Sequence, residues 1–195
     1  MPQNNEKRIK EFVERFPLLS PTLSALDTHK IEWMIGGSGN LFLLGNDRIP
    51  DDVDIYLRNE DHDRADEIFK IKSFEYKSET ERVRNSNPEG DHSIQLTSHL
   101  RIIVDSKEYD LHISDEVMSN RIKLSYGQQT IWLLPPEDVL LIKALLQRGK
   151  DVGKNDIEDI NKFKSIYSID HSYLMERIKG IGAEKRVSGI FPEIL

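Results

Sequence analysis

The sequence of 195 residues predicts one α+β domain (mixed α/β), in which a mixed sheet is flanked by helices. Three observations predict this class. The chain is long enough for one hydrophobic core but short for two. Strand-like alternation dominates from about residue 72 to residue 134, and helix-like spacing dominates both ends of the chain. We therefore expect a core with N-terminal helices over 1–134 and a helical C-terminal segment over 135–195, packed together as a single compact unit.

The N-terminal part of the sequence alternates helices with a strand. Apolar residues recur at helical spacing over 5–16, and Pro17 ends this pattern. A second, shorter helix is predicted over 21–26. An apolar strand over 31–35 leads into a turn of glycines, and a short apolar helix follows over 40–44. This part therefore predicts a strand, a tight turn and a helix in succession.

The remaining elements divide into a sheet and a helical end. Residues 52–57 alternate polar and apolar side chains, which predicts a half-buried strand, and Asp61 can cap a helix that runs to about residue 69. The segment 78–91 is rich in charge, Asn, Pro and Gly, so we expect a mobile surface loop there. The other elements expected are strands over 94–96, 100–104, 109–113 and 130–134, and helices over 135–147, 156–167 and 171–178.

The composition excludes several kinds of site and partner. The 27 Lys and Arg residues face 34 Asp and Glu residues, so the net charge of −7 disfavours a long nucleic acid, whereas a small anion can bind together with metal ions. The sequence has no Cys, which excludes thiolate zinc sites and Cys nucleophiles and favours the cytoplasm. The best apolar run is broken by Lys143 and is far shorter than the roughly 20 residues a membrane helix needs. We expect no membrane partner.

Two carboxylates lie two residues apart in a predicted strand. Because residues two apart project from the same face, Asp52 and Asp54 present their side chains together, while Val53 and Ile55 point into the core. Their Cα atoms would lie roughly 7 Å apart, and both side chains could converge on a hard divalent cation such as Mg²⁺. An acidic, solvated edge strand is the alternative interpretation.

The glycine turn adds a second kind of ligand to this region. Gly36 and Gly37 let the backbone approach a ligand closely, and exposed amides together with the Ser38 hydroxyl can hold phosphate oxygens. Taken alone, the turn is equally compatible with an ordinary flexible connection between a strand and a helix. The combination with the paired carboxylates favours a site for phosphate and metal.

The segment Gly36-Gly37-Ser38 followed by Asp52-Val53-Asp54 resembles the signature of the nucleotidyltransferase superfamily, whose fold is shared by DNA polymerase β and by small aminoglycoside, lincosamide and toxin–antitoxin nucleotidyltransferases. The resemblance implies that Ser38, with the two glycines, holds a triphosphate. It also implies that Asp52 and Asp54 bind two Mg²⁺ ions, which Mn²⁺ can replace.

The same family expects a third carboxylate on a later strand. Asp110 fits this expectation, because Tyr109 and Leu111 would share the apolar face of its strand and leave Asp110 on the other face. Asp105 is the competitor, although its Asp-Ser-Lys setting is typical of a hairpin turn. Lys143 interrupts an apolar helix face, so it either reaches the triphosphate or extends its ammonium group to solvent.

The resemblance implies a metal-dependent enzyme that transfers a nucleoside monophosphate from an NTP, ATP first among them, to a hydroxyl acceptor and releases pyrophosphate. Asp52, Asp54 and Asp110 would then be catalytic residues and metal ligands. The alternative is a non-catalytic nucleotide-binding or toxin–antitoxin regulatory module of the same fold, which would act on a protein partner. A homodimer is compatible with either reading.

Overall fold

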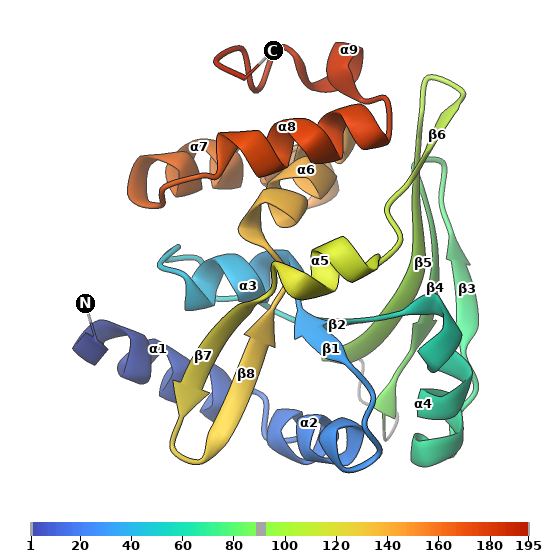
Figure 1. Ribbon diagram of the computed structural model, residues 1–195, viewed down its shortest axis with the longest axis vertical. Helices are drawn as coiled ribbons and strands as arrows, with labels where there is room; N and C mark the ends of the chain where they lie inside the picture. Colours follow the sequence, from blue (N-terminus) through green and yellow to red (C-terminus); the bar gives the residue numbers. More distant parts are fainter. Residues whose placement is uncertain (1, 89–92, 195) are drawn as a thin grey trace.

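The computed structural model describes residues 2–88 and 93–194, which form a mixed sheet with helices on both faces (Figure 1). The predicted α+β class is confirmed. The strand order is β3-β4-β5-β2-β1-β8-β7, and β6 pairs with β5 outside this path. The strands are β1 (Trp33–Ile35), β2 (Val53–Leu57), β3 (Phe74–Lys77), β4 (Glu81–Ser86), β5 (Ile94–Val104), β6 (Lys107–Asp110), β7 (Ile122–Tyr126) and β8 (Gln129–Leu133).

The helices precede, interrupt and follow these strands. They are α1 (Pro2–Arg15), α2 (Leu19–Thr28), α3 (Gly37–Leu43), α4 (His62–Phe69), α5 (Asp115–Ser119), α6 (Pro136–Leu146), α7 (Asp156–Ile166), α8 (His171–Gly180) and α9 (Glu184–Val187). Within the described ranges, no helix combines the length and the apolar composition of a bilayer-spanning segment.

The central strands β1 and β2 divide their side chains between two hydrophobic clusters. The strands are antiparallel, with Ile35 opposite Ile55, and both residues belong to the cluster that α1 and α2 cover. Met34 and Tyr56 point to the other face and join the cluster that contains residues of α6 to α9. Because residues two apart in a strand share a face, Asp54 lies on the same side of the sheet as Tyr56. The carboxylate therefore faces the C-terminal helices.

Helix α6 lies in the middle of these C-terminal helices and contacts α3, β5, α7, α8 and α9 (Figure 1). All its residues except Ile142 are buried, and they include Glu137, Asp138 and Lys143. A buried charge is costly unless it is paired. Asp138 accepts hydrogen bonds from the Tyr173 hydroxyl at 2.6 Å and from Arg177 Nε at 2.7 Å. Lys143 has its own carboxylate partners, which lie next to the candidate site.

The structure corrects the expectation of a loop over 78–91. Strand β4 occupies 81–86 and pairs with β3 on one side and with β5 on the other; residues 89–91 of the expected loop lie outside the described residues. The charges that suggested a loop are accommodated by ion pairs. Arg84 pairs with Asp63 and Asp66 of α4, and Glu81 pairs with Arg148 after α6.

Candidate active site

The glycine turn after β1 brings the backbone against two side chains of β2. The Gly36 amide donates to the Asp54 carbonyl at 2.9 Å, and a Cβ atom on Gly36 would lie 2.3 Å from Cε2 of Tyr56. Gly37 has φ +56°, and a Cβ atom there would lie 2.3 Å from Oδ2 of Asp54. Only glycine avoids both the strain and the collision. The Asp54 carboxylate therefore lies directly against the start of α3.

The two carboxylates of the Asp-Val-Asp segment face the same pocket. Burial, and after it the negative charge of Asp52, raises the pKa of Asp54 to about 6. Neither side chain accepts a hydrogen bond from, or pairs with, a described residue. Two carboxylates in this state suit a divalent cation, whose oxygen ligands are commonly Asp side chains. The residues present therefore fit a metal ion at Asp52 and Asp54.

The pocket has a volume of about 360 Å³ and lies between the sheet and the C-terminal helices. The acidic segment and the start of α3 line it together with four cationic side chains. Two aromatic residues of β3, both well exposed, stand at its edge. The polar lining residues are Gly37, Ser38, Asp51, Asp52, Asp54, Tyr56, Glu81, Asn85, Gln95 and Thr97, the cations are Arg48, Lys143, Arg148 and Lys154, and the aromatic residues are Phe74 and Tyr76.

Of the three residues predicted to hold phosphate, two line the pocket and one does not. Gly37 and Ser38 line the pocket, and the Ser38 hydroxyl makes no hydrogen bond to a described residue. Gly36 is not among the residues that line the pocket, and its amide is already bound to Asp54. Gly37 and Ser38 can therefore contact a ligand in the pocket. Gly36 has a structural role, because only a residue without a side chain fits against the Tyr56 ring.

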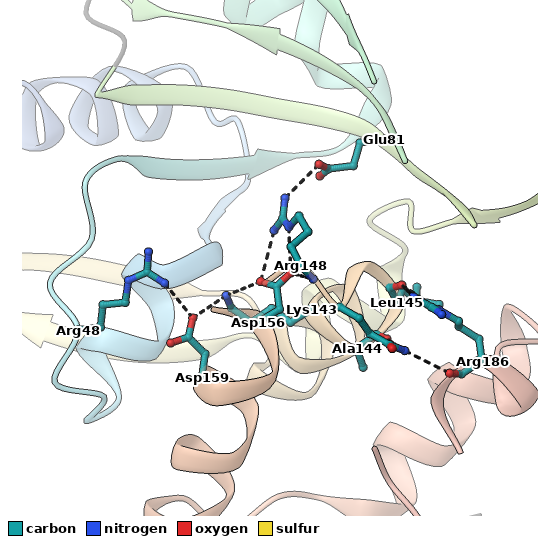
Figure 2. Close-up of polar contacts among 10 residues, drawn as sticks. Arg48, Glu81, Lys143, Ala144, Leu145, Arg148, Asp156, Asp159 and Arg186 are labelled. Atoms are coloured by element: carbon teal, nitrogen blue, oxygen red, sulfur yellow. Dashed lines mark hydrogen bonds and ion pairs between the residues drawn. The ribbon is translucent and has the colours of Figure 1, made fainter. Parts of the chain in front are cut away.

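Lys143 lines the pocket, but its ammonium group is held by two carboxylates of α7 (Figure 2). Nζ donates to Asp156 at 3.1 Å and to Asp159 at 2.8 Å, and the residue is only 6% exposed. The alternative of a solvent-exposed lysine is therefore wrong. Arg48 also pairs with Asp159, at 3.4 Å. Asp156 and Asp159 therefore neutralise the positive charges of Lys143 and Arg48.

Lys154 differs from the other cations of the pocket. Arg48, Lys143 and Arg148 each pair with at least one carboxylate, whereas Lys154 has no ion pair with a described residue. Its positive charge acts on Asp54 and opposes the rise of the Asp54 pKa. Lys154 is exposed, as its sequence context of an ordinary surface lysine predicts, and only its place in the pocket marks it as a candidate site residue.

Asp110 does not line the pocket, so its predicted role beside Asp52 and Asp54 is not supported by its position. It ends β6 opposite Arg101 of β5, it is exposed, and it accepts a hydrogen bond from the His112 amide at 3.1 Å. Side chains alternate along a strand. Tyr109 takes the buried face, and Asp110 takes the opposite one.

Asp105 is no replacement, since it lies in the hairpin turn between β5 and β6. Asp105 and Ser106 both have positive φ, 51° and 64°, as a two-residue hairpin turn of type I′ requires. The sequence interpretation of a turn is confirmed. In the part of the chain that the structure describes, no three His, Asp or Glu side chains form a group that could hold a metal ion.

The strand next to Asp54 carries an amide at the position opposite this carboxylate. β5 is parallel to β2, and Gln95 is the register partner of Asp54. Gln95 Oε1 accepts a hydrogen bond from Asn85 Nδ2 at 3.2 Å, and Asn85 Oδ1 accepts one from the Thr97 hydroxyl at 3.0 Å. The floor of the pocket beside the two carboxylates is therefore polar and neutral.

Tyr56 contributes an unused hydroxyl to this floor. The residue is 7% exposed, lines the pocket, and makes no side-chain hydrogen bond to a described residue. Burial, followed by the charges of Asp54 and Glu81, raises the pKa of Tyr56 well above its usual value. The phenol therefore keeps its proton and can donate a hydrogen bond to an anionic oxygen.

The comparisons with solved structures agree with the fold. A Thermotoga maritima protein assigned as a nucleotidyltransferase is 18% identical, with a TM-score of 0.57 over 78% of this chain and 93% of that one. The antibiotic-resistance factor ANT(2'')-Ia is 13% identical, with a TM-score of 0.51 over 95% of this chain and 96% of that one. The lincosamide antibiotic adenylyltransferase LnuA is 16% identical, with a TM-score of 0.46 over 78% of this chain and 98% of that one.

The sequence comparisons identify the family. No curated protein matches the chain. A family model described as "Nucleotidyl transferase of unknown function (DUF2204)" matches residues 15–188. This range includes the glycine turn, the paired carboxylates and the cations of the pocket. The chain therefore belongs to this family of nucleotidyl transferases.

Proposed function

We propose that the protein transfers a nucleoside monophosphate from an NTP, with ATP as the first candidate, to a hydroxyl group of a second substrate and releases pyrophosphate. One observation carries the proposal. Asp52, Asp54, Ser38 and Lys154 line one pocket, and none of their side chains has a hydrogen-bond or ion-pair partner among the described residues. Unpartnered carboxylates on one side and an unpaired cation on the other suit a metal-bound triphosphate better than a structural ion pair.

The chain's own residues divide the work of this reaction. Asp52 and Asp54 would hold the divalent cation, Mg²⁺ or Mn²⁺, which when bound neutralises phosphate charge and lowers the pKa of an attacking hydroxyl. Ser38 and Lys154 would orient the phosphates. Tyr56, which keeps its proton, would donate to an anionic oxygen near Asp54. Transfer then depends mainly on positioning and on charge neutralisation, as in other phosphoryl transfers.

A second candidate function is supported by a specific observation. Gln95 stands beside Asp54, and no three-acid group occurs in the described ranges. Of the carboxylates that line the pocket, Asp51 and Glu81 are paired with arginines, and only Asp52 and Asp54 lack a partner among the described residues. A site with two available carboxylates could bind a nucleotide with metal and act as a regulatory module without transferring it. The two candidates share the binding step and differ in turnover.

Binding is tested by thermal unfolding with ATP, with MgCl₂, and with both. A ligand at about 100 times its Kd stabilises the folded state by about 2.7 kcal/mol, which for a chain of this size raises Tm by roughly 5–10 °C. We expect this rise only with ATP and Mg²⁺ together. Asp52→Asn and Asp54→Asn should abolish it, whereas Asp110→Asn, a carboxylate outside the pocket, should retain it. A rise that survives both pocket variants would refute the proposed site.

Turnover is tested by incubating the protein with α-labelled ATP, Mg²⁺ and a cell lysate, and by following both labelled products and pyrophosphate. Transfer of the label to an acceptor, lost in Asp54→Asn, supports the enzyme. Binding with neither labelled acceptor nor pyrophosphate, in lysates fractionated over small molecules, RNA and protein, supports the regulatory module.

A further inference from the structure

Arg148 occupies a special place between the two sides of the pocket. It follows α6 and points its guanidinium across to β4, where Nη1 donates to Oε2 of Glu81 at 3.0 Å (Figure 2). The two residues are 67 positions apart in the chain. Both line the pocket, with side chains 25% and 18% exposed. The pair therefore connects the sheet wall to the C-terminal helices within reach of a bound ligand.

One edge of the Arg148 guanidinium is held by Asp156. Nε and the backbone amide of Arg148 donate to Oδ2 of Asp156 at 2.9 and 3.0 Å, and Asp156 is fully buried at the start of α7. Asp156 also binds Lys143 and cannot follow a moving guanidinium. The pair with Asp156 therefore orients Arg148, and the edge that faces Glu81 is the part free to change partner.

The partner on that edge is itself replaceable. Glu81 has one carboxylate oxygen on Arg148, and no second cation pairs with it among the described residues. Without Glu81, Arg148 would still be paired with Asp156, so loss of the Glu81 contact would not leave a buried charge without a partner. Phosphate offers an arginine the same planar pair of oxygens as a carboxylate and binds it more strongly because it carries more charge.

We propose that Arg148 is a phosphate-binding residue and that Glu81 holds its guanidinium in place until a phosphate of the NTP takes over the Nη1 contact. The inference rests on the proposed function, because it needs a nucleotide in the pocket. It assigns Glu81 the role of a competing anion. Removal of the Glu81 charge should therefore strengthen nucleotide binding, whereas removal of a metal-ligating carboxylate would weaken it.

The test is a double-mutant cycle on the full chain. Affinity for α,β-methylene ATP with Mg²⁺ is measured by titration calorimetry for the wild type, Glu81→Gln, Arg148→Gln and the double variant. We expect Glu81→Gln to tighten binding by about three- to tenfold and Arg148→Gln to weaken it by about tenfold. The double variant should bind like Arg148→Gln alone, since Glu81 acts only through Arg148.

Two controls keep the result specific. Glu108→Gln removes a carboxylate from β6 that pairs with Arg82 and Arg101 outside the pocket, and it should leave the affinity unchanged. If Arg148→Gln does not fold by circular dichroism, Arg148→Lys takes its place. A lysine keeps the charge but cannot bind Asp156 and a phosphate through one planar fork, so the gain from Glu81→Gln should shrink in that background.

Three outcomes overturn the inference. Weaker binding in Glu81→Gln would mean that Glu81 helps to hold the metal and nucleotide. A gain of equal size with and without Arg148 would mean that Glu81 acts by general repulsion. A wild type that does not bind the ATP analogue with Mg²⁺ would overturn the proposed function, and the inference with it. In the first two outcomes the proposed function stands.

Discussion

Asp54→Asn should stabilise the metal-free protein at pH 7, although it removes a residue that the proposed function requires. Burial and the neighbouring Asp52 raise the pKa of Asp54 from 3.8 to about 6. A carboxyl group whose pKa is that much higher in the folded state lowers the free energy of unfolding by about 3 kcal/mol at pH 7. The Asn variant carries no charge there, but its amide is still a polar group in the pocket, so it regains only part of this free energy. We therefore expect a gain of about 1–3 kcal/mol.

The stability difference between Asp54→Asn and the wild type should also depend on pH. Between pH 3.8 and about 6 the folded protein holds a proton on Asp54 that the unfolded chain does not hold. The free energy of unfolding of the wild type therefore decreases as the pH rises through this window. Below the window, Asp54 is protonated in both states and causes no loss of stability. The advantage of Asp54→Asn should be greatest at pH 7 and should disappear near pH 4.

The assay is urea denaturation with EDTA present, at pH 4, 5, 6 and 7, with Asp110→Asn as the matched control. Asp110 is exposed, so its replacement should change the free energy of unfolding by no more than about 0.5 kcal/mol. If Asp54→Asn is less stable than the wild type at pH 7, or if its advantage does not change with pH, Asp54 is a structural residue and the argument for a strained carboxylate pair fails.

Three further substitutions separate structural from binding roles. Gly37→Ala places a Cβ atom against Asp54 Oδ2 at a position with φ +56°, so it should lower the free energy of unfolding by more than about 1 kcal/mol and abolish the Tm rise with ATP and Mg²⁺. Lys143→Met leaves Asp156 and Asp159 short of a buried partner and should cost about 3–5 kcal/mol in urea denaturation; a variant of normal stability would contradict the buried ion-pair cluster. Lys154→Ala should leave stability within about 0.5 kcal/mol and weaken ATP binding several-fold by calorimetry, and unchanged affinity would remove Lys154 from the site.

The local part of the site could be predicted from the sequence, because it depends on elements that follow one another. A strand, a glycine turn, a short helix and a second strand bring Ser38 near Asp54 whatever the rest of the chain does. Asp52 directly precedes β2, and the alternation of side chains then predicts that it shares a face with Asp54. These inferences need no knowledge of distant partners, and the structure brings all three residues to one pocket.

The rest of the site depends on pairings between distant segments. Whether Asp110 faces the pocket is decided by the register of β6 on β5 and by which face of β5 packs on the helices, and neither is readable from local periodicity. The charged segment of β4 looked like a loop because its partners, Arg148 among them, lie far away in the sequence. Asp156 and Asp159 lie in the first turn of α7, where acidic residues are common, and nothing in the local sequence indicates that both also bind Lys143.

The amide floor beside Asp54 also has a genetic and practical consequence. Every glutamine codon becomes a glutamate codon by one base change, and the two side chains have nearly the same shape. A glutamate at position 95 could still accept the hydrogen bond that Asn85 Nδ2 now donates to the Gln95 oxygen. The pocket can therefore gain a negative charge next to its paired carboxylates without a change of volume or of backbone. An engineer who wants to tune how tightly this protein holds a cation has, at Gln95, a position where charge is the only variable.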